Sequence, residues 1–222
     1  MLAPILLSLR IATIATVFSF VLGIFFAYII NKTKLPGKNI WETIIILPMI
    51  LPPSVTGYFL LLVLGKRGII GSTLIDIFGF KIIFTWYAAV IAACIVSLPL
   101  MYQNVKSAFV SMDPIYANAA KTLGSGSFKT FMTVTFPLAM PGIVSGTVLA
   151  FCRAIGEFGA TLMVAGNIPG KTQTVPTAIY YAVETGKTEQ ANILVGVMTI
   201  FSFILIFSLN SWLKRKNYTG QE

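Results

Sequence analysis

The chain has 222 residues, of which 56% are apolar and only 10% are charged, against about 25% charged residues in an ordinary soluble domain. A soluble fold of this length could not bury so much apolar surface, so the composition predicts a single all-α domain, residues 1–222, in a lipid bilayer. The net charge of +9 comes from short basic clusters between apolar runs, which is typical of membrane-protein loops and argues against a nucleic-acid partner. Histidine is absent, so we expect no metal site, no cofactor and no catalytic residue.

Five apolar segments are predicted to be transmembrane helices, because each has close to the roughly 20 residues that a helix needs to cross the hydrocarbon core. They cover about 11–30, 44–64, 82–101, 138–155 and 193–213. The first is not a signal peptide, since its apolar core is too long and no small-residue cleavage site follows. Cys94 and Cys152 fall inside apolar runs, and we predict that both are buried and unpaired.

Basic residues predict the orientation, because cytoplasmic loops of membrane proteins are enriched in Lys and Arg. Three of them follow the first span: Lys32, Lys34 and Lys38. The run Lys214-Arg215-Lys216 directly follows the last span. Alternation places 31–42 and 102–137 inside, and 65–81 and most of 153–192 outside. We therefore expect a multi-pass protein of the cytoplasmic membrane with its N-terminus outside and its C-terminus inside.

Prolines interrupt two predicted spans: Pro48, Pro52 and Pro53 in the second, and Pro99 in the third. Proline kinks a helix and leaves a backbone carbonyl that needs a new partner. The kinks either serve packing, or they place a bent helix beside a water-filled path. On the second interpretation, the residues expected to line the path include Pro52, Pro53, Ser54 and Ser97.

The fourth span carries a stripe of small residues at every fourth position: Gly142, Gly146, Ala150 and Ala154. Such a stripe predicts close approach of another helix. Arg153 and Glu157 stand four residues apart, so a continuous helix would place both on one face. One interpretation, which we favour, is an ion pair within the helix. The other is a pair in which the arginine faces a passing anion. Thr161 is a further candidate for the path. A strong anion site would trap a transported ion, so we expect few strong ligands.

The segment after the fourth span is expected to lie mostly outside. Residues 158–166 are apolar but too short to cross the membrane, so they either extend the fourth helix or dip back into the bilayer. Pro176 is placed to begin a short helix through Val183. This segment either packs over the mouth of a path or belongs to a gate or a receptor platform.

The inner segment 103–137 is patterned too regularly for a plain linker. Asp113 is a typical helix N-cap, Pro114 suits the first helical position, and Gly124 is a typical stop for a helix over 114–123. Residues 128–134 are predicted to form a second short helix before Pro137. We call residues 113–136 the knob. A projecting pair of short helices is suited to docking into a groove of a partner protein.

The knob resembles the cytoplasmic signature of permease subunits of binding-protein-dependent ABC importers. That signature reads Glu-Ala-Ala, three residues, Gly, nine residues, Ile, one residue, Leu-Pro. Here Asn118-Ala119-Ala120, Gly124, Val134 and Phe136-Pro137 stand at the same spacing, with Asn118 in place of the acidic residue. The resemblance implies the type I ABC importer permease fold, and it implies that the knob is a coupling helix for an ATPase subunit.

A second stretch resembles the molybdate permeases: Arg153 to Thr161, then 167–170 and 174–176. Sulfate permeases share the Gly-Glu-Phe-Gly-Ala core at 156–160. The resemblance implies a homodimer, two ATPase copies, an external molybdate-binding protein and molybdate as cargo, with sulfate, thiosulfate or tungstate as alternatives. Two Gly-Lys-Thr triplets, at 170–172 and 186–188, lack the earlier glycine of a phosphate-binding loop, so ATP hydrolysis is expected in another chain. A secondary transporter, a channel or a membrane enzyme would leave the knob unexplained.

Overall fold

The computed structural model describes residues 2–32 and 37–218, and every regular element within them is a helix. This confirms the predicted all-α class. Lys34, part of the predicted inner basic cluster, lies outside the described residues. The elements are α1 (Leu2–Lys32), α2 (Lys38–Ile50), α3 (Pro53–Leu64), α4 (Ile69–Phe78), α5 (Trp86–Val110), α6 (Pro114–Thr122), α7 (Ser127–Thr130), η1 (Phe131–Thr135), α8 (Phe136–Leu138), α9 (Met140–Ile155), α10 (Gly159–Ala165), α11 (Val175–Glu184) and α12 (Thr188–Tyr218).

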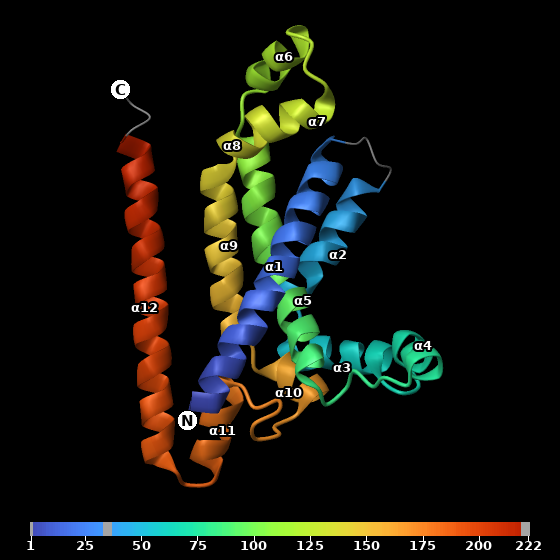
Figure 1. Ribbon diagram of the computed structural model, residues 1–222, viewed down its shortest axis with the longest axis vertical. Coiled ribbons are helices and arrows are strands. Elements are labelled where there is room, and N and C mark those ends of the chain that lie inside the picture. The colour runs from blue at the N-terminus through green and yellow to red at the C-terminus, as the bar shows by residue number, and fades with distance from the viewer. Residues whose placement is uncertain (1, 33–36, 219–222) are drawn as a thin grey trace.

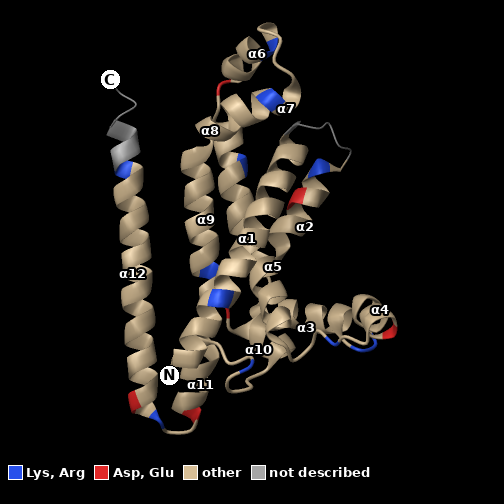
Figure 2. Ribbon diagram, viewed as in Figure 1, with Lys and Arg blue, Asp and Glu red and all other residues tan. Residues whose placement is uncertain are grey.

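The molecule is elongated, and its two ends differ in character (Figure 1). α1, α5 and α9 run side by side through the middle and contact one another. The knob, built from α6, α7 and η1, projects at one end, and the short helices α3, α4, α10 and α11 lie at the other. α12 runs the full length at one side, where it contacts α9 and α11. Most charged positions lie toward the two ends of the molecule, with a few basic positions between them (Figure 2), and such clustering at the ends is expected of membrane-crossing elements.

Small residues allow α5 to approach its neighbours closely. The buried alanines of its first half are Ala88, Ala89, Ala92 and Ala93, and they pack with Ile11, Ala12 and Ala15 of α1. On α9, a Cβ at Gly142 would come within 2.5 Å of the Ala108 Cβ, and one at Gly146 within 2.9 Å of the Asn104 Cβ. The predicted role of the small-residue stripe in helix packing is confirmed. Cys94 and Cys152 are free, as predicted, and Cys94 is buried; the prediction that Cys152 is buried is wrong, since it is partly exposed on α9.

Three helices are long and apolar enough to cross a bilayer: Leu2–Asn31, Trp86–Val110 and Thr188–Lys214. Two further pairs of helices reach that length only together. Residues 127–138 and 140–155 meet at 70°, and α2 meets α3 at 115°. By length and composition, the described residues therefore hold three spans, or up to five if each bent pair crosses as one unit.

The region expected to form a kinked span at 44–64 is divided between α2 and α3. Leu51 precedes a proline and takes an extended conformation with φ −66° and ψ 143°, which ends α2. Pro52 continues the extended backbone, and Pro53 begins α3. Consecutive prolines therefore produce a break, and α3 lies across the end of the bundle opposite the knob (Figure 1).

The chain breaks again after α9. Gly156 ends this helix and α10 begins only at Gly159, so residues 158–166 do not extend the fourth helix. α10 packs instead against α3 and α5. The predicted helix at Pro176 is present as α11, and its Val175 N–H donates a hydrogen bond to Ser8 Oγ of α1 over 2.8 Å. The segment 155–190 thus folds back onto the bundle rather than forming an open loop.

Candidate functional site

The knob begins with a side-chain cap. The Asp113 carboxylate accepts a hydrogen bond from the Ile115 N–H over 2.9 Å, and Pro114 occupies the first turn of α6. This cap satisfies one of the backbone donors that a helix leaves free at its start. The sequence-based assignment of the start of α6 is confirmed.

The end of α6 is fixed by a glycine turn. Gly124 has φ +83°, a conformation that glycine adopts without steric cost. Its N–H donates to the Lys121 carbonyl over 2.9 Å, and the Ser125 N–H donates to the Ala120 carbonyl over 3.0 Å. These two bonds form a Schellman motif, which closes the helix and reverses the chain toward α7.

The knob exposes large apolar side chains. Leu123 is 88% exposed and Phe128 is 74% exposed, and both flank the Gly124 turn. Ile115 and Tyr116 of α6 are also exposed, and α6 contains no buried residue. Exposed apolar groups on a short, capped helix pair are suited to burial in a partner's groove. Ala119 is exposed and Ala120 is partly exposed on α6, and Pro137 is exposed in α8.

An aromatic cluster attaches the knob to the bundle. The Phe131 ring of η1 lies 4.5 Å from the Tyr28 ring of α1, 6.2 Å from that of Phe109 on α5 and 6.2 Å from that of Phe136. Sequence reasoning did not single out these rings, although aromatic residues in three separated segments were visible. η1 itself is a π-helix, a rare element in which Phe131 turns inward to this cluster.

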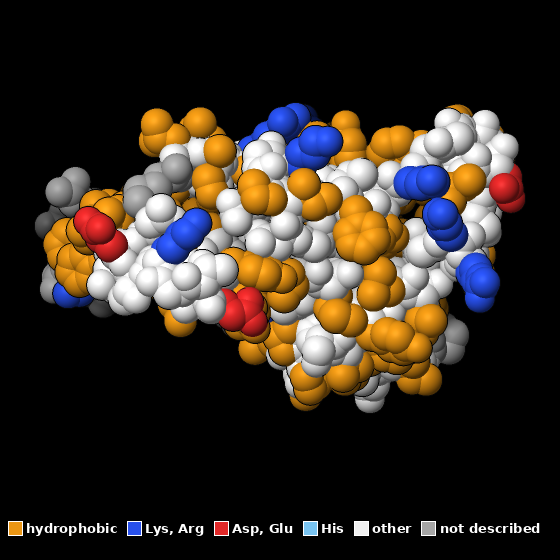
Figure 3. All heavy atoms as spheres, turned by 90° about the horizontal axis from the view of Figure 1, so that it is seen from below, with side chains coloured by type: hydrophobic (Ala, Val, Ile, Leu, Met, Phe, Trp, Pro, Cys, Tyr) orange, Lys and Arg blue, Asp and Glu red, His pale blue; other side chains and the backbone are white. Residues whose placement is uncertain are grey.

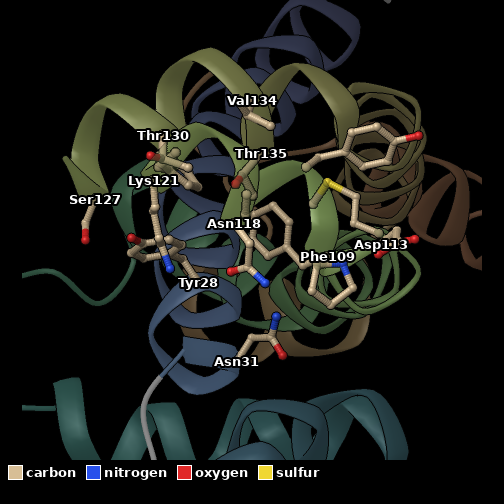
Figure 4. A pocket seen from close by; sticks show the side chains of 15 residues that line it. Tyr28, Asn31, Phe109, Asp113, Asn118, Lys121, Ser127, Thr130, Val134 and Thr135 are labelled. Atoms are coloured by element: carbon tan, nitrogen blue, oxygen red, sulfur yellow. The ribbon is translucent and has the colours of Figure 1, made fainter. Parts of the chain in front are cut away.

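A cavity of about 380 Å³ separates the knob from the bundle beside that cluster. Its lining comes from α1, α5, α6, α7 and η1, and Figure 4 shows Asn118 of α6 and Asn31 of α1 both pointing into it. Asn118, which stands where the signature has an acidic residue, therefore lies on the inner side of the knob. The knob is held at its base while α6 stands away from the bundle.

The second group of predicted site residues lies at the opposite end of α9. Arg153 Nη1 lies 2.7 Å from Glu157 Oε2, so the predicted ion pair forms. α9 ends at Ile155, however, and the pair bridges the break instead of lying within one helix. The other oxygen, Glu157 Oε1, accepts the Ala160 N–H of α10 over 2.9 Å. Glu157 is 1% exposed and Arg153 is 33% exposed, so the carboxylate is a buried clamp between α9 and α10.

The residues predicted to line a path divide into two sets. Pro52, Pro53 and Ser54 are exposed around the α2–α3 break. Ser97 is fully buried, with its Oγ 2.8 Å from Ser19 Oγ of α1, and Thr161 is buried in α10. Ser97, Thr161 and Glu157 present no surface to a solute in this conformation, because their own chain packs around them.

Glycine brings α3 and α10 into close contact, and we call these two helices the outer plate, after the external side on which the charge pattern predicts this end to lie. A Cβ at Gly57 of α3 would lie 2.7 Å from the Met163 Cβ and 3.0 Å from the Ala160 Cα. A Cβ at Gly159 would lie 2.6 Å from the Pro53 Cβ. The plate is therefore packed backbone against backbone, next to the Glu157 clamp.

One ion pair was missed from the sequence. Lys106 Nζ of α5 lies 2.7 Å from Glu42 Oε2 of α2, on the knob side of the bundle. Lys106 lies in the segment 102–137 that the charge pattern predicts to be inside. The two residues are 64 positions apart, so no local pattern could have paired them.

The geometry defines an integral membrane protein with a projecting knob at one end and a closely packed plate at the other. The chain belongs to the family described as binding-protein-dependent transport system inner membrane component, which matches residues 19–217. It is therefore a multi-pass permease subunit of an ABC transporter of the inner membrane. Members of this family work with an ATPase and a substrate-binding protein.

Curated relatives cover nearly the whole chain. The molybdenum transport system permease protein ModB of Escherichia coli (strain K12) is 42% identical over 211 residues, covering 95% of this chain and 92% of that protein. The putative molybdenum transport system permease protein YvgM of Bacillus subtilis (strain 168) is 42% identical over 204 residues, covering 92% and 90%. The sulfate transport system permease protein CysT of Escherichia coli (strain K12) is 31% identical, covering 90% and 72%.

Solved transporters share the fold. A bacterial ABC transporter involved in the import of the acidic polysaccharide alginate matches with a TM-score of 0.77 at 16% identity, covering 96% of this chain and 79% of that chain. The MetNI methionine ABC transporter in inward-facing conformations matches with a TM-score of 0.73 at 16% identity, covering 97% and 95%. The expected type I ABC importer permease fold is confirmed.

Proposed function

We propose that this chain is the membrane-spanning subunit of an ATP-driven molybdate importer. The knob is the observation that carries the transport assignment, because its capped helix, glycine turn and exposed apolar side chains form a docking element at the spacing of the importer signature. The identity of 42% to ModB over 95% of the chain supports molybdate as the cargo. Sulfate is the second candidate, since the 31% identical CysT also matches over most of this chain.

The working complex, on this proposal, contains two copies of the chain, two ATPase subunits and an external molybdate-binding protein. The N-terminus lies outside and the C-terminus inside, which places the knob in the cytoplasm and the outer plate on the external side. ATP is hydrolysed by the partner subunit and not by this chain. Binding of ATP draws the two knobs together and turns the path outward, and hydrolysis returns it, as a rigid-body switch between two states.

The outer plate forms the external closure in this mechanism. The exposed Pro52, Pro53 and Ser54 lie where the plate meets α2 and are the proposed path-lining residues. Arg153 keeps one third of its side chain exposed while it neutralises Glu157, so it offers a passing oxyanion a weak, already shared charge. A weak site is what transport requires, because a tight one would retain the ion.

The test is uptake by the complete complex in proteoliposomes. We expect ATP-dependent accumulation of molybdate that requires the receptor and is lost when the partner ATPase carries an inactivating substitution. Accumulation of sulfate with no accumulation of molybdate would transfer the assignment to the second candidate. Uptake that persists without the ATPase would contradict the proposal as a whole.

A further inference from the structure

Helix α4 has the pattern of a helix lying in a membrane–water interface. It has 10 residues, too few to cross a bilayer, and it packs on α3 at the end of the molecule opposite the knob. At 3.6 residues per turn its polar residues share one face: Ser72, Thr73 and Asp76. Ile69, which is 84% exposed, falls on the same face, and the other apolar residues occupy the rest of the circumference.

The start of α4 packs on the protein along one face, and its end is exposed. Gly71 is buried, and a Cβ there would collide with the carbonyl oxygens of Leu64 and Gly65; Leu74 packs against the core of the bundle. Ile77 and Phe78, by contrast, are 66% and 72% exposed. The last turn of α4 therefore combines exposed apolar side chains with the polar Asp76, a mixture expected of an interfacial helix.

Basic residues flank this helix on both sides. Lys66 and Arg67 precede α4 and Lys81 follows it; all three are exposed, and none belongs to an ion pair among the described residues. Figure 3, a view onto this end, shows basic side chains gathered at the side where α4 lies, with an acidic side chain at the margin. The excess of positive charge complements an anionic lipid surface.

Aromatic residues next to α4 indicate that this helix lies at the level of a membrane–water interface. The Phe80 N–H donates to the Leu74 carbonyl at the end of α4, and the Phe80 ring lies 5.7 Å from that of Tyr87. Tyr87 in turn lies against Trp86, the first residue of the membrane-length helix α5, with 3.9 Å between ring centroids and the rings tilted by 33°. Trp and Tyr concentrate where a membrane helix leaves the hydrocarbon. The boundary at α5 is thus tied by contact to α4.

We propose that α4 with Lys66, Arg67 and Lys81 is a binding surface for anionic phospholipid headgroups, with Ile77 and Phe78 inserted among the acyl chains. The leaflet is the outer one if the orientation under the proposed function holds. Because α4 packs on α3 and α3 belongs to the outer plate, the lipid contact stabilises the plate in the arrangement described. Transport by the complex therefore depends on anionic lipid through this surface.

The test uses the full-length chain in its complex, in nanodiscs of phosphatidylcholine with or without phosphatidylglycerol. A bimane label is placed at Ile77→Cys in a background with Cys94→Ala and Cys152→Ala. Brominated phosphatidylglycerol is expected to quench it more strongly than brominated phosphatidylcholine. The triple change Lys66→Gln, Arg67→Gln and Lys81→Gln should remove that excess several-fold, whereas Lys171→Gln with Lys187→Gln, exposed cations of the same end, should preserve it.

Three results would overturn the inference. Equal quenching by the two lipids, or an excess that survives the triple change, would show that the cations do not select anionic lipid. Quenching by neither lipid would show that a receptor or a second copy of the chain covers α4. This readout needs no transport, so it remains decisive if the cargo assignment fails. ATP-driven uptake is measured separately, in proteoliposomes of the same lipids. Uptake by the parent chain should fall when phosphatidylglycerol is removed, whereas uptake by the triple variant should not.

Discussion

The two ends of this molecule are built on opposite principles. The knob is specified by local chain signals, a cap at Asp113 and a turn at Gly124, and its helix α6 has no buried residue and stands away from the bundle. The outer plate is specified by long-range packing, with Gly57 and Gly159 in backbone contact and the Glu157 carboxylate buried. This difference suits the proposed roles, because an element pulled by a partner needs its own rigidity, whereas one that closes a path needs a tight fit to its neighbours.

Breaking the clamp beside the plate is expected to have the largest effect. Arg153→Gln leaves the Glu157 carboxylate buried with only the Ala160 N–H as partner, and loss of one member of a buried pair costs about 3–5 kcal/mol. The purified protein should therefore unfold at a clearly lower temperature and assemble poorly. Arg10→Gln, which removes an exposed arginine stacked on Trp86, is the control and should change stability little. Normal assembly with slow uptake in Arg153→Gln would instead assign the arginine to the path.

Crowding the plate should have the next largest effect. Gly57→Ala places a Cβ 2.7 Å from that of Met163 and 3.0 Å from the Ala160 backbone, and overpacking of this kind costs about 1–3 kcal/mol. The expected result is a lower thermal stability together with slower uptake, because α3 must move away from α10. Gly196→Ala is the matched control, since a Cβ there meets nothing within 4 Å. Equal stability of the two variants would mean that the close contact between α3 and α10 does not matter.

Gly124, in the glycine turn of the knob, can be substituted without a clash with neighbouring atoms, since a Cβ there meets nothing within 4 Å. Gly124→Val forces a β-branched residue into φ +83°, which costs about 1–2 kcal/mol, although nothing lies near its Cβ. Insertion and thermal stability of the bundle should be nearly unchanged, while receptor-stimulated ATP hydrolysis by the complex is lost because the turn between α6 and α7 reopens. Gly126→Ala, at negative φ in equally open space, should retain the stimulation. Unimpaired stimulation in Gly124→Val would remove the turn from the coupling mechanism.

The cap should give the smallest effect. Asp113→Ala removes the acceptor for the Ile115 N–H, and the loss of an N-cap costs about 0.5–2 kcal/mol. We expect a partial decrease in stimulated ATP hydrolysis and faster amide exchange confined to α6. Asp113→Asn should restore both, since asparagine caps as well as aspartate. A decrease of the same size in Asp113→Asn would point to the charge rather than to the hydrogen bond.

The same contrast explains what the sequence could predict. The bounds of α6, predicted as 114–123 and observed as 114–122, follow from a cap, a proline and a glycine that act within a few residues. The turn of 115° between α2 and α3, the burial of Ser97 against Ser19 and the pairing of Lys106 with Glu42 depend on segments far apart in the chain. The Arg153–Glu157 pair lies between these cases: its spacing predicted contact, but the end of α9 at Ile155 turned it into a clamp between helices.

The central claim is that the knob is the cytoplasmic docking element for a separate ATPase, and accessibility of Leu123 tests it most directly. This side chain is 88% exposed at the tip of the knob, so Leu123→Cys should react readily with a membrane-impermeant maleimide. We predict labelling in inside-out vesicles, no labelling in intact cells, and protection when the ATPase is bound, with the parent chain reporting the background from Cys94 and Cys152. Labelling from outside the cell, or labelling that bound ATPase does not reduce, would contradict the account.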